Sequence, residues 1–140
     1  MSGFLWAVLT AIIWGIVPLM EKVGLSGSIA PSMGVMARSL GVVVGFVVFA
    51  LLWSPWGALQ SLSWKTWLLL AGGGFVASFV GQLAFYHALK GGAISQVTPV
   101  AGAYPLVAAL LGWIVLREPL TLTRLLGVVC VVLGVLLLRR

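Results

Sequence analysis

The sequence predicts an all-α, polytopic membrane protein with five transmembrane helices. Of its 140 residues, 62% are hydrophobic and only 7% are charged, and the mean hydropathy is +1.23. A soluble domain carries about 25% charged residues, so this composition does not provide a water-soluble surface. A soluble enzyme and a disordered chain are therefore excluded.

Charged and turn residues divide the chain into apolar runs of about 20 residues, the length that crosses the hydrocarbon core of a bilayer. The first run ends before Glu21 and Lys22, and the linkers between runs are too short for an extramembrane domain. We therefore expect a single transmembrane domain over residues 1–140. Its predicted spans are residues 3–20, 33–53, 66–89, 94–116 and 122–138.

Each of the later spans has a recognisable boundary. Pro31 precedes the second span, Lys65 and Lys90 bound the third, and residues 117–119 (Arg-Glu-Pro) end the fourth. The fifth span ends at the Arg-Arg pair 139–140. It is short unless Arg124 extends its side chain to the interface, which is inexpensive near a helix end.

The net charge of +6 reflects eight basic and two acidic residues. The basic residues form no cluster or basic helix face, so nucleic acid is excluded as a partner. By the predicted span directions they divide almost evenly: Lys22, Lys90, Arg139 and Arg140 on one side, Lys65, Arg117 and Arg124 on the other, with Arg38 inside the second span and nearer the first group. The positive-inside rule favours a cytoplasmic C-terminus by a narrow margin. The chain is therefore compatible with insertion in both orientations, and we expect it in the cytoplasmic membrane of a bacterium or archaeon.

An odd number of spans suggests how the protein assembles. Many transporters consist of two inverted repeats with the substrate site at their interface, and two oppositely inserted copies of one five-span chain supply both repeats. This predicts an antiparallel homodimer; a parallel dimer and a pairing with a different chain are the alternatives. Gly127, Cys130 and Gly134 form a small-residue stripe on the fifth span that suits close helix packing. Packing within one subunit is the other reading of such a stripe, and for this span we favour the dimer interface.

Strongly polar groups inside spans are functional candidates by default, because they are costly in lipid. Arg38 is a candidate substrate-binding residue, although extension to the interface or pairing with Glu21 explains it equally well. Gln82 is a second candidate, or a hydrogen-bonding link between helices. His87 and Glu21 are candidate proton-coupling groups, although an interfacial hydrogen bond is the simpler explanation for His87.

Two aromatic residues and two prolines add to these candidates. Trp14 and Tyr104 lie near the middle of their spans, where the polar atom of each ring needs a partner in a cavity or on another helix. Pro18 and Pro105 remove backbone donors, which frees the carbonyls of Trp14 and Ala101. Such a carbonyl at membrane depth is tolerated where it lines a cavity or finds another partner. We therefore expect helix kinks at both prolines, for a binding cavity or for packing alone.

The sequence offers no basis for cofactor, metal or enzymatic chemistry. Its lone cysteine, Cys130, lies in an apolar run and has no partner for a disulfide within the chain. No clustered acids, histidine pair or nucleophile with an adjacent base is present, so we predict no cofactor, no metal site and no catalytic residues.

Several of these segments together resemble the EamA domain, the repeat unit of the drug/metabolite transporter superfamily. They are Ala11–Gly15 in the first span, Arg38 in the second, Phe85–Lys90, Pro105, Leu116–Thr121, and Leu126 with Gly127. The resemblance covers essentially the whole chain through the order and spacing of these segments. Family members usually have ten spans in two fused inverted domains, and this chain resembles one of those domains.

The resemblance implies alternating-access export or exchange of small metabolites such as amino acids. It carries over to Trp14, Arg38, Tyr86 and Pro105, and adds Tyr86 to the substrate-binding candidates Trp14, Arg38, Gln82 and Tyr104. Since Arg38 attracts anionic groups, we expect a zwitterionic or anionic substrate. The alternatives are a small multidrug or guanidinium exporter, and a non-transporting subunit that partners another five-helix chain. The small multidrug relatives carry a carboxylate in mid-first helix, and residues 12–15 here contain no acid.

Overall fold

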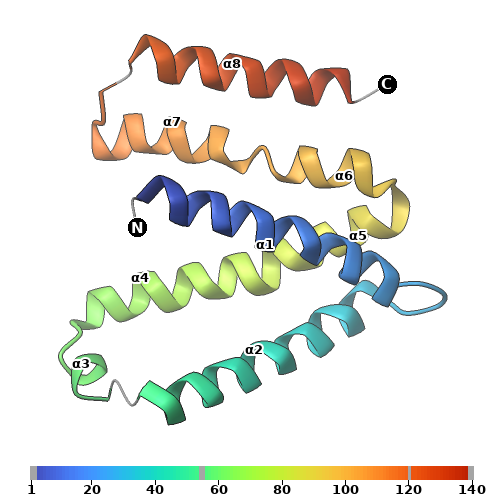
Figure 1. Ribbon diagram of the computed structural model, residues 1–140. Coiled ribbons are helices and arrows are strands. Elements are labelled where there is room, and N and C mark those ends of the chain that lie inside the picture. The colour runs from blue at the N-terminus through green and yellow to red at the C-terminus, as the bar shows by residue number, and fades with distance from the viewer. Residues whose placement is uncertain (1–2, 54–55, 120, 139–140) are drawn as a thin grey trace. The chain divides into compact units, whose positions relative to one another are not determined.

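The computed structural model describes residues 3–53, 56–119 and 121–138, and within these ranges the chain is helical with no strand (Figure 1). Four described helices are long and apolar enough to cross a membrane: Leu5–Gly24, Pro31–Trp53, Trp64–Gly91 and Ile94–Leu116. Leu122–Leu137 is a shorter apolar helix. The predicted all-α, polytopic membrane fold is confirmed. The chain forms two compact units, an N-terminal unit (Met1–Gly91) and a C-terminal unit (Gly92–Arg140).

The N-terminal unit begins with α1 (Gly3–Gly24), which runs past the predicted end of the first span. Glu and Lys are good helix formers, so the helix continues through Glu21 and Lys22, and the Leu25 amide donates to the Glu21 carbonyl at 2.8 Å. Glu21 therefore belongs to the helix rather than to a loop. The chain then reverses at Gly27, whose φ of +71° is one that glycine adopts without strain.

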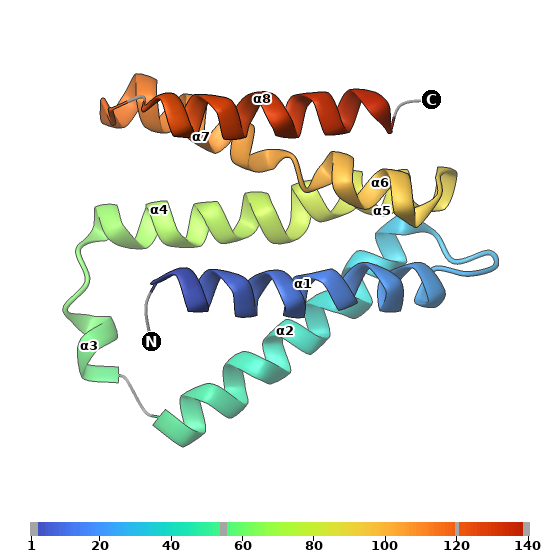
Figure 2. The ribbon, with the colours of Figure 1, turned by 45° about the horizontal axis from the view of Figure 1, so that its top comes forward.

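The second helix, α2 (Pro31–Trp53), begins at a proline, as suits a first-turn position that needs no amide donor. Its N-terminal part packs on α5, and from there α2 diverges from α4 (Figures 1 and 2). The short α3 (Trp56–Gln60) follows α2. Ser63 then caps α4, since its hydroxyl accepts the Thr66 amide at 3.1 Å.

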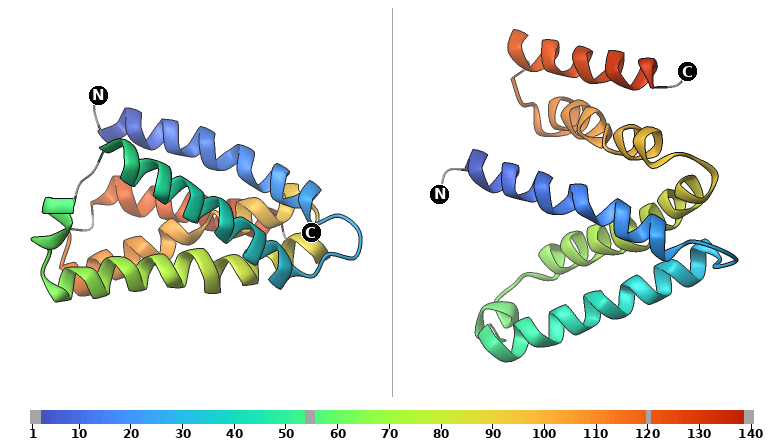
Figure 3. Two further views of the ribbon diagram at one scale, coloured as in Figure 1. Left: turned by 90° about the horizontal axis from the view of Figure 1, so that it is seen from below. Right: turned by 45° about the vertical axis from the view of Figure 1, so that its right-hand side comes forward.

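The third span is one continuous rod with a π-helical turn in its middle (Figure 3). It comprises α4 (Trp64–Phe75), η1 (Val76–Gly81) and α5 (Gln82–Gly91). Three glycines, Gly72 to Gly74, lie in the last turn of α4 and are separated from η1 by Phe75, and glycine holds the α-helical conformation weakly. A π turn accommodates one residue more than an α turn, and such turns occur frequently at functional sites. This turn was not predicted, and it changes the direction in which α5 presents its side chains.

A small core holds α2 and α5 together beside the end of α1. Val35, Tyr86 and Leu89 are buried there, together with Leu25 from the segment that follows α1. Gly34 permits this approach: a β-carbon at its position would lie 2.5 Å from Leu25 Cδ2 and 2.8 Å from the Tyr86 ring. The absence of a side chain at residue 34 is therefore what lets α2 lie against Tyr86.

The C-terminal unit contains α6 (Ile94–Ala101), α7 (Tyr104–Leu116) and α8 (Leu122–Leu137), with α8 running beside α7 (Figure 1). The kink expected at Pro105 is a break: the helix stops at Ala101, and Pro105 stands in the first turn of α7. Arg117 ends α7 in the left-handed conformation, with φ of 54°. At about 1.5 Å per residue, the 16 residues of α8 span roughly 24 Å, less than the ~30 Å hydrocarbon core.

Replacing Gly34 with alanine should destabilise the N-terminal unit, because the added methyl group overlaps the ring of a buried tyrosine. Overpacking of this kind costs about 1–3 kcal/mol. Gly41→Ala in the same helix is the control, since a β-carbon there meets nothing within 4 Å. The thermal unfolding midpoint in detergent micelles should fall for Gly34→Ala and not for Gly41→Ala; equal midpoints for the two variants would contradict the close approach.

Candidate functional site

One carboxylate oxygen is the centre of the polar cluster in the N-terminal unit. Glu21 Oε1 accepts hydrogen bonds from Gln82 Nε2 at 2.8 Å and from the Tyr86 hydroxyl at 2.9 Å. The Arg38 guanidinium forms an ion pair with the same oxygen, with Nε at 3.3 Å. Three side chains from α2 and α5 thus converge on an acceptor from α1. We call Glu21, Arg38, Gln82 and Tyr86 the Glu21 cluster.

The folding of each helix explains how these four side chains meet. Gln82 and Tyr86 are four residues apart at the start of α5, so they lie on one face of the helix directly after η1. Arg38 lies one turn after the close approach at Gly34, and its Nη1 also donates a long, 3.5 Å bond to the Ser78 carbonyl inside η1. Ser78 gives the π turn a direct contact with the cluster.

The charges of Glu21 and Arg38 cancel, and the side chains of the cluster are mostly buried. The Glu21 side chain is only 9% exposed and that of Arg38 is 31% exposed, while Tyr86 is 3% exposed as a residue. A buried carboxylate is strongly destabilising unless it is paired and hydrogen-bonded. Arg38 supplies the opposite charge, and Gln82 and Tyr86 supply neutral donors.

Two lysines bind backbone carbonyls at the same end of the N-terminal unit. Lys22 Nζ donates to the Leu89 carbonyl in the last turn of α5. Lys90 Nζ donates to the Gly27 carbonyl of the loop after α1 at 3.0 Å. The last carbonyls of a helix have no partner within it, so the Lys22 contact satisfies one of them. Lys22 and Lys90 therefore lie at one end of this unit, and Arg139 and Arg140 lie outside the described residues.

The other candidates in this unit surround the cluster without joining it. Trp14 is 60% exposed and lies about 10 Å before Glu21 along α1. Pro18 lies between these two residues in the sequence. Its side chain is buried, and α1 continues through it without a break. His87 is exposed beside the buried Tyr86. Of the sequence candidates, the structure thus brings together Glu21, Arg38, Gln82 and Tyr86.

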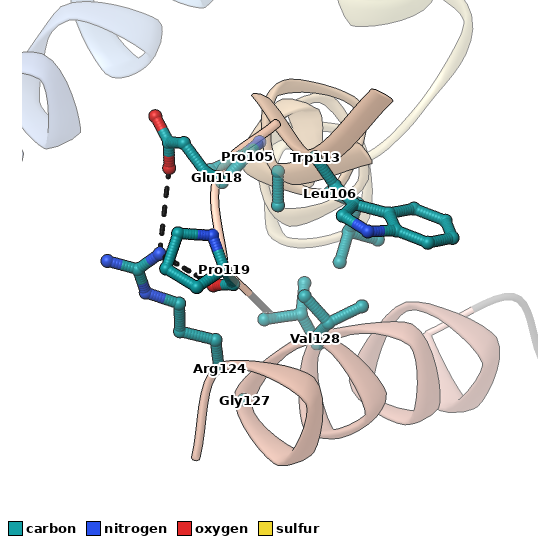
Figure 4. A pocket seen from close by; sticks show the side chains of 10 residues that line it. Pro105, Leu106, Trp113, Glu118, Pro119, Arg124, Gly127 and Val128 are labelled. Carbon is teal, nitrogen blue, oxygen red and sulfur yellow. Dashed lines mark hydrogen bonds and ion pairs between the residues drawn. The ribbon is translucent and has the colours of Figure 1, made fainter. Parts of the chain in front are cut away.

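The C-terminal unit has a groove of about 450 Å³ between α7 and α8 (Figure 4). Pro105, Trp113 and Gly127 line it, and Trp113 lies on the side opposite the Glu118–Arg124 ion pair. That pair is 3.6 Å long, and both side chains are more than half exposed, so it contributes little stability. The groove is otherwise lined by Leu106, Ala109, Pro119, Val128 and Val131.

The remaining candidates in the C-terminal unit are accessible. Tyr104 is 57% exposed at the start of α7, and Cys130 is exposed on α8. Added β-carbons at Gly127 and Gly134 would meet nothing within 4 Å. The small-residue stripe of α8 thus borders the groove at Gly127 and makes no close contact at its two glycines.

Two features of the site were not predicted from the sequence. The first is the close approach at Gly34, where the Tyr86 ring leaves no room for a side chain. The sequence shows only that a glycine lies near the start of the second span. The second is the contact of the Ser78 carbonyl, in the π turn, with Arg38. The nearby glycines Gly72 to Gly74 are the feature of the sequence that could have indicated a π turn. Within the described residues, no three His, Cys, Asp or Glu side chains group as a metal site would require.

The arrangement is suited to binding rather than to covalent chemistry. Arg38, Gln82 and Tyr86 together form a set of donors around a carboxylate oxygen, and guanidinium, amide and hydroxyl groups are the usual ligands of carboxylates in proteins. The occupant of this donor set in the structure is the chain's own Glu21. Its position among apolar, membrane-length helices defines a helical membrane protein with a polar side-chain cluster between helices.

Comparisons with known proteins identify the class. The EamA-like transporter family matches residues 1–140, and the chain belongs to this family. It is 29% identical over 133 residues to a Sinorhizobium protein described as an uncharacterized transporter in the cobO 3′ region, covering 95% of this chain and 93% of the relative. It is also 36% identical over 59 residues to an uncharacterized protein of Methanocaldococcus jannaschii, covering 42% and 43% of the two chains. No solved structure matches the chain.

The predicted resemblance is thereby confirmed, and the protein is an integral membrane protein of a transporter family. A transporter family is not an enzyme family, which agrees with the expectation drawn from the residues.

Removing the tyrosine hydroxyl from the Glu21 cluster should destabilise the protein, because a hydrogen bond to a charged group contributes about 1.5–3 kcal/mol. The chain contains two tyrosines, which provides a matched control: Tyr86 is buried in the cluster and Tyr104 is 57% exposed. Unfolding in micelles should show Tyr86→Phe destabilised by that amount and Tyr104→Phe changed by less than about 0.5 kcal/mol. If Tyr86→Phe were as stable as the parent protein, the hydroxyl would have no role in holding Glu21.

Proposed function

We propose that this protein transports small zwitterionic or anionic metabolites, such as amino acids, as an exporter or exchanger. The observation that carries the proposal is the convergence of Arg38, Gln82 and Tyr86 on one carboxylate oxygen. A site built to bind a carboxylate, within a chain of a transporter family, is suited to a substrate that carries one. Trp14 and Tyr104 are the proposed aromatic contacts of the substrate.

We further propose alternating access by an antiparallel homodimer. One chain of this size corresponds to one repeat of an inverted-repeat transporter, and two opposed copies complete the pathway. The stripe of Gly127, Cys130 and Gly134 is the proposed packing surface between subunits. The near-even distribution of basic residues supports dual insertion. Its bacterial and archaeal relatives support placement in a cytoplasmic membrane.

Export of cationic drugs is the weaker alternative. A cation exporter needs a carboxylate that is available to the substrate, whereas Glu21 already pairs with Arg38. Any cation entering alone would compete with a guanidinium held beside the same oxygen, and would leave that guanidinium without its counter-ion.

A flux assay tests the transport proposal. Purified protein in liposomes should exchange radiolabelled amino acids across the membrane, and Arg38→Gln should lower the rate at least about tenfold, the usual effect of removing a charged partner from a binding site. Lys65→Gln is the control, because Lys65 is an exposed basic residue in the first turn of α4 and lies outside the Glu21 cluster. Equal loss in both variants, or no flux with any substrate of this class, would contradict the proposed function.

Topology reporters test the dimer separately. A C-terminal fluorescent reporter active only in the cytoplasm and a C-terminal phosphatase active only outside it should both give signal, because half of the copies insert in each orientation. Signal from one reporter alone would contradict the antiparallel form, and flux with that result would point to a parallel dimer or a different partner chain.

A further inference from the structure

The Glu21–Arg38 ion pair restricts the charge that a bound substrate can carry. The pair has a net charge of zero and is surrounded by the donors Gln82 and Tyr86. A substrate carboxylate that takes over all three donors of Glu21 Oε1, including the Arg38 Nε, must displace Glu21 from them. The displaced carboxylate then needs a new positive partner, since an unpaired charge among membrane helices is strongly unfavourable.

Each of the other lysines in the described N-terminal unit has a contact of its own or lies far from the cluster along the third span. Lys22 donates to the Leu89 carbonyl and Lys90 to the Gly27 carbonyl. Lys65 belongs to the first turn of α4, at the opposite end of the third span from Gln82 and Tyr86. A substrate that carries a positive charge of its own can supply the replacement.

We infer that the substrate is a zwitterion that inserts between Glu21 and Arg38. Its carboxylate takes the place of Glu21 Oε1 on Arg38, Gln82 and Tyr86, and its ammonium group binds the displaced Glu21 carboxylate. One ion pair becomes two, and the net charge of the site is unchanged. An anion alone leaves Glu21 unpaired, and a cation alone leaves Arg38 unpaired. This inference rests on the proposed function, and adds to it the division of roles between the two charged residues.

The structure provides a reason for Glu21 to be the part that moves. The donors sit on α2 and α5, which are locked together by the buried Val35, Tyr86 and Leu89 and by the close approach at Gly34. Glu21 follows Pro18 by three residues, and a proline removes one helical hydrogen bond from α1. Glu21 also has a flexible side chain, so it can leave Oε1's position while the donor set stays in place.

Matched analogues separate the two substrate charges. The probes at pH 7 are alanine, propionate and ethylamine, and phenylalanine with 3-phenylpropionate and 2-phenylethylamine. The three compounds of each set share a side chain. The amino acid carries both charges, the second compound only the carboxylate, and the third only the ammonium group. In proteoliposomes, the parent protein should transport at least one of the amino acids about tenfold or more faster than either of its single-charge analogues.

Glu21→Gln then tests the role assigned to the carboxylate. The variant keeps the size of the side chain and removes its charge, so Arg38 is left for the substrate and no ammonium is required. It should lose the preference for the amino acid over the carboxylate analogue. Glu118→Gln, at the only other acid in the chain, should keep that preference. Thermal shifts of both purified variants establish that they are folded.

The possible outcomes distinguish the inference from the function on which it rests. Carboxylate analogues transported by the parent protein as fast as the amino acids would overturn the insertion of a zwitterion and leave anion transport standing. An unchanged preference in folded Glu21→Gln would overturn the role of Glu21 alone. Flux of the amines only, or of none of the six probes, would overturn the proposed function together with the inference.

Discussion

A carboxylate among membrane-length helices must be matched by donors, and the N-terminal unit is organised around meeting that requirement at Glu21. Its oxygen Oε1 receives an arginine, an amide and a phenol from two other helices. Hydrophobic burial provides little drive for helix association in lipid, where packing and polar contacts take its place. The Glu21 cluster therefore joins α1, α2 and α5 and at the same time forms the site with the clearest chemistry.

The packing around the cluster keeps its donors in position. Gly34 allows α2 to reach the Tyr86 ring, and η1 precedes the two donors of α5 directly. The first is a position without a side chain in α2, and the second is a departure from regular α-helical geometry in the third span. They make structural sense together, because a regular helix without η1 would present Gln82 and Tyr86 in another direction, and a side chain at residue 34 would push α2 away.

Much of the fold was predictable, since apolar runs and helix-breaking residues act locally. The long helices follow the apolar runs, and Pro105 marks an interruption of the fourth span because it lacks an amide hydrogen. Pairing of Arg38 with Glu21 was one of the alternatives drawn from the sequence. The convergence of all four cluster residues was not predicted, because periodicity places a side chain on a face of its own helix and does not say which helix lies opposite. A π turn also shifts that face, and glycines alone do not locate such a turn. The substrate-binding roles of all five candidates stay predictions: Trp14, Arg38, Gln82, Tyr86 and Tyr104.

The central claim, that Glu21 and Arg38 act as one unit, is tested most directly by a double-mutant cycle on unfolding free energy in micelles. The cycle compares the parent protein with Glu21→Gln, Arg38→Gln and the double variant. Residues in one buried polar network show interaction energies of about 0.5–3 kcal/mol. We expect a coupling in this range, with Arg38→Gln much less destabilising once Glu21 is uncharged. Additive effects of the two substitutions would contradict it.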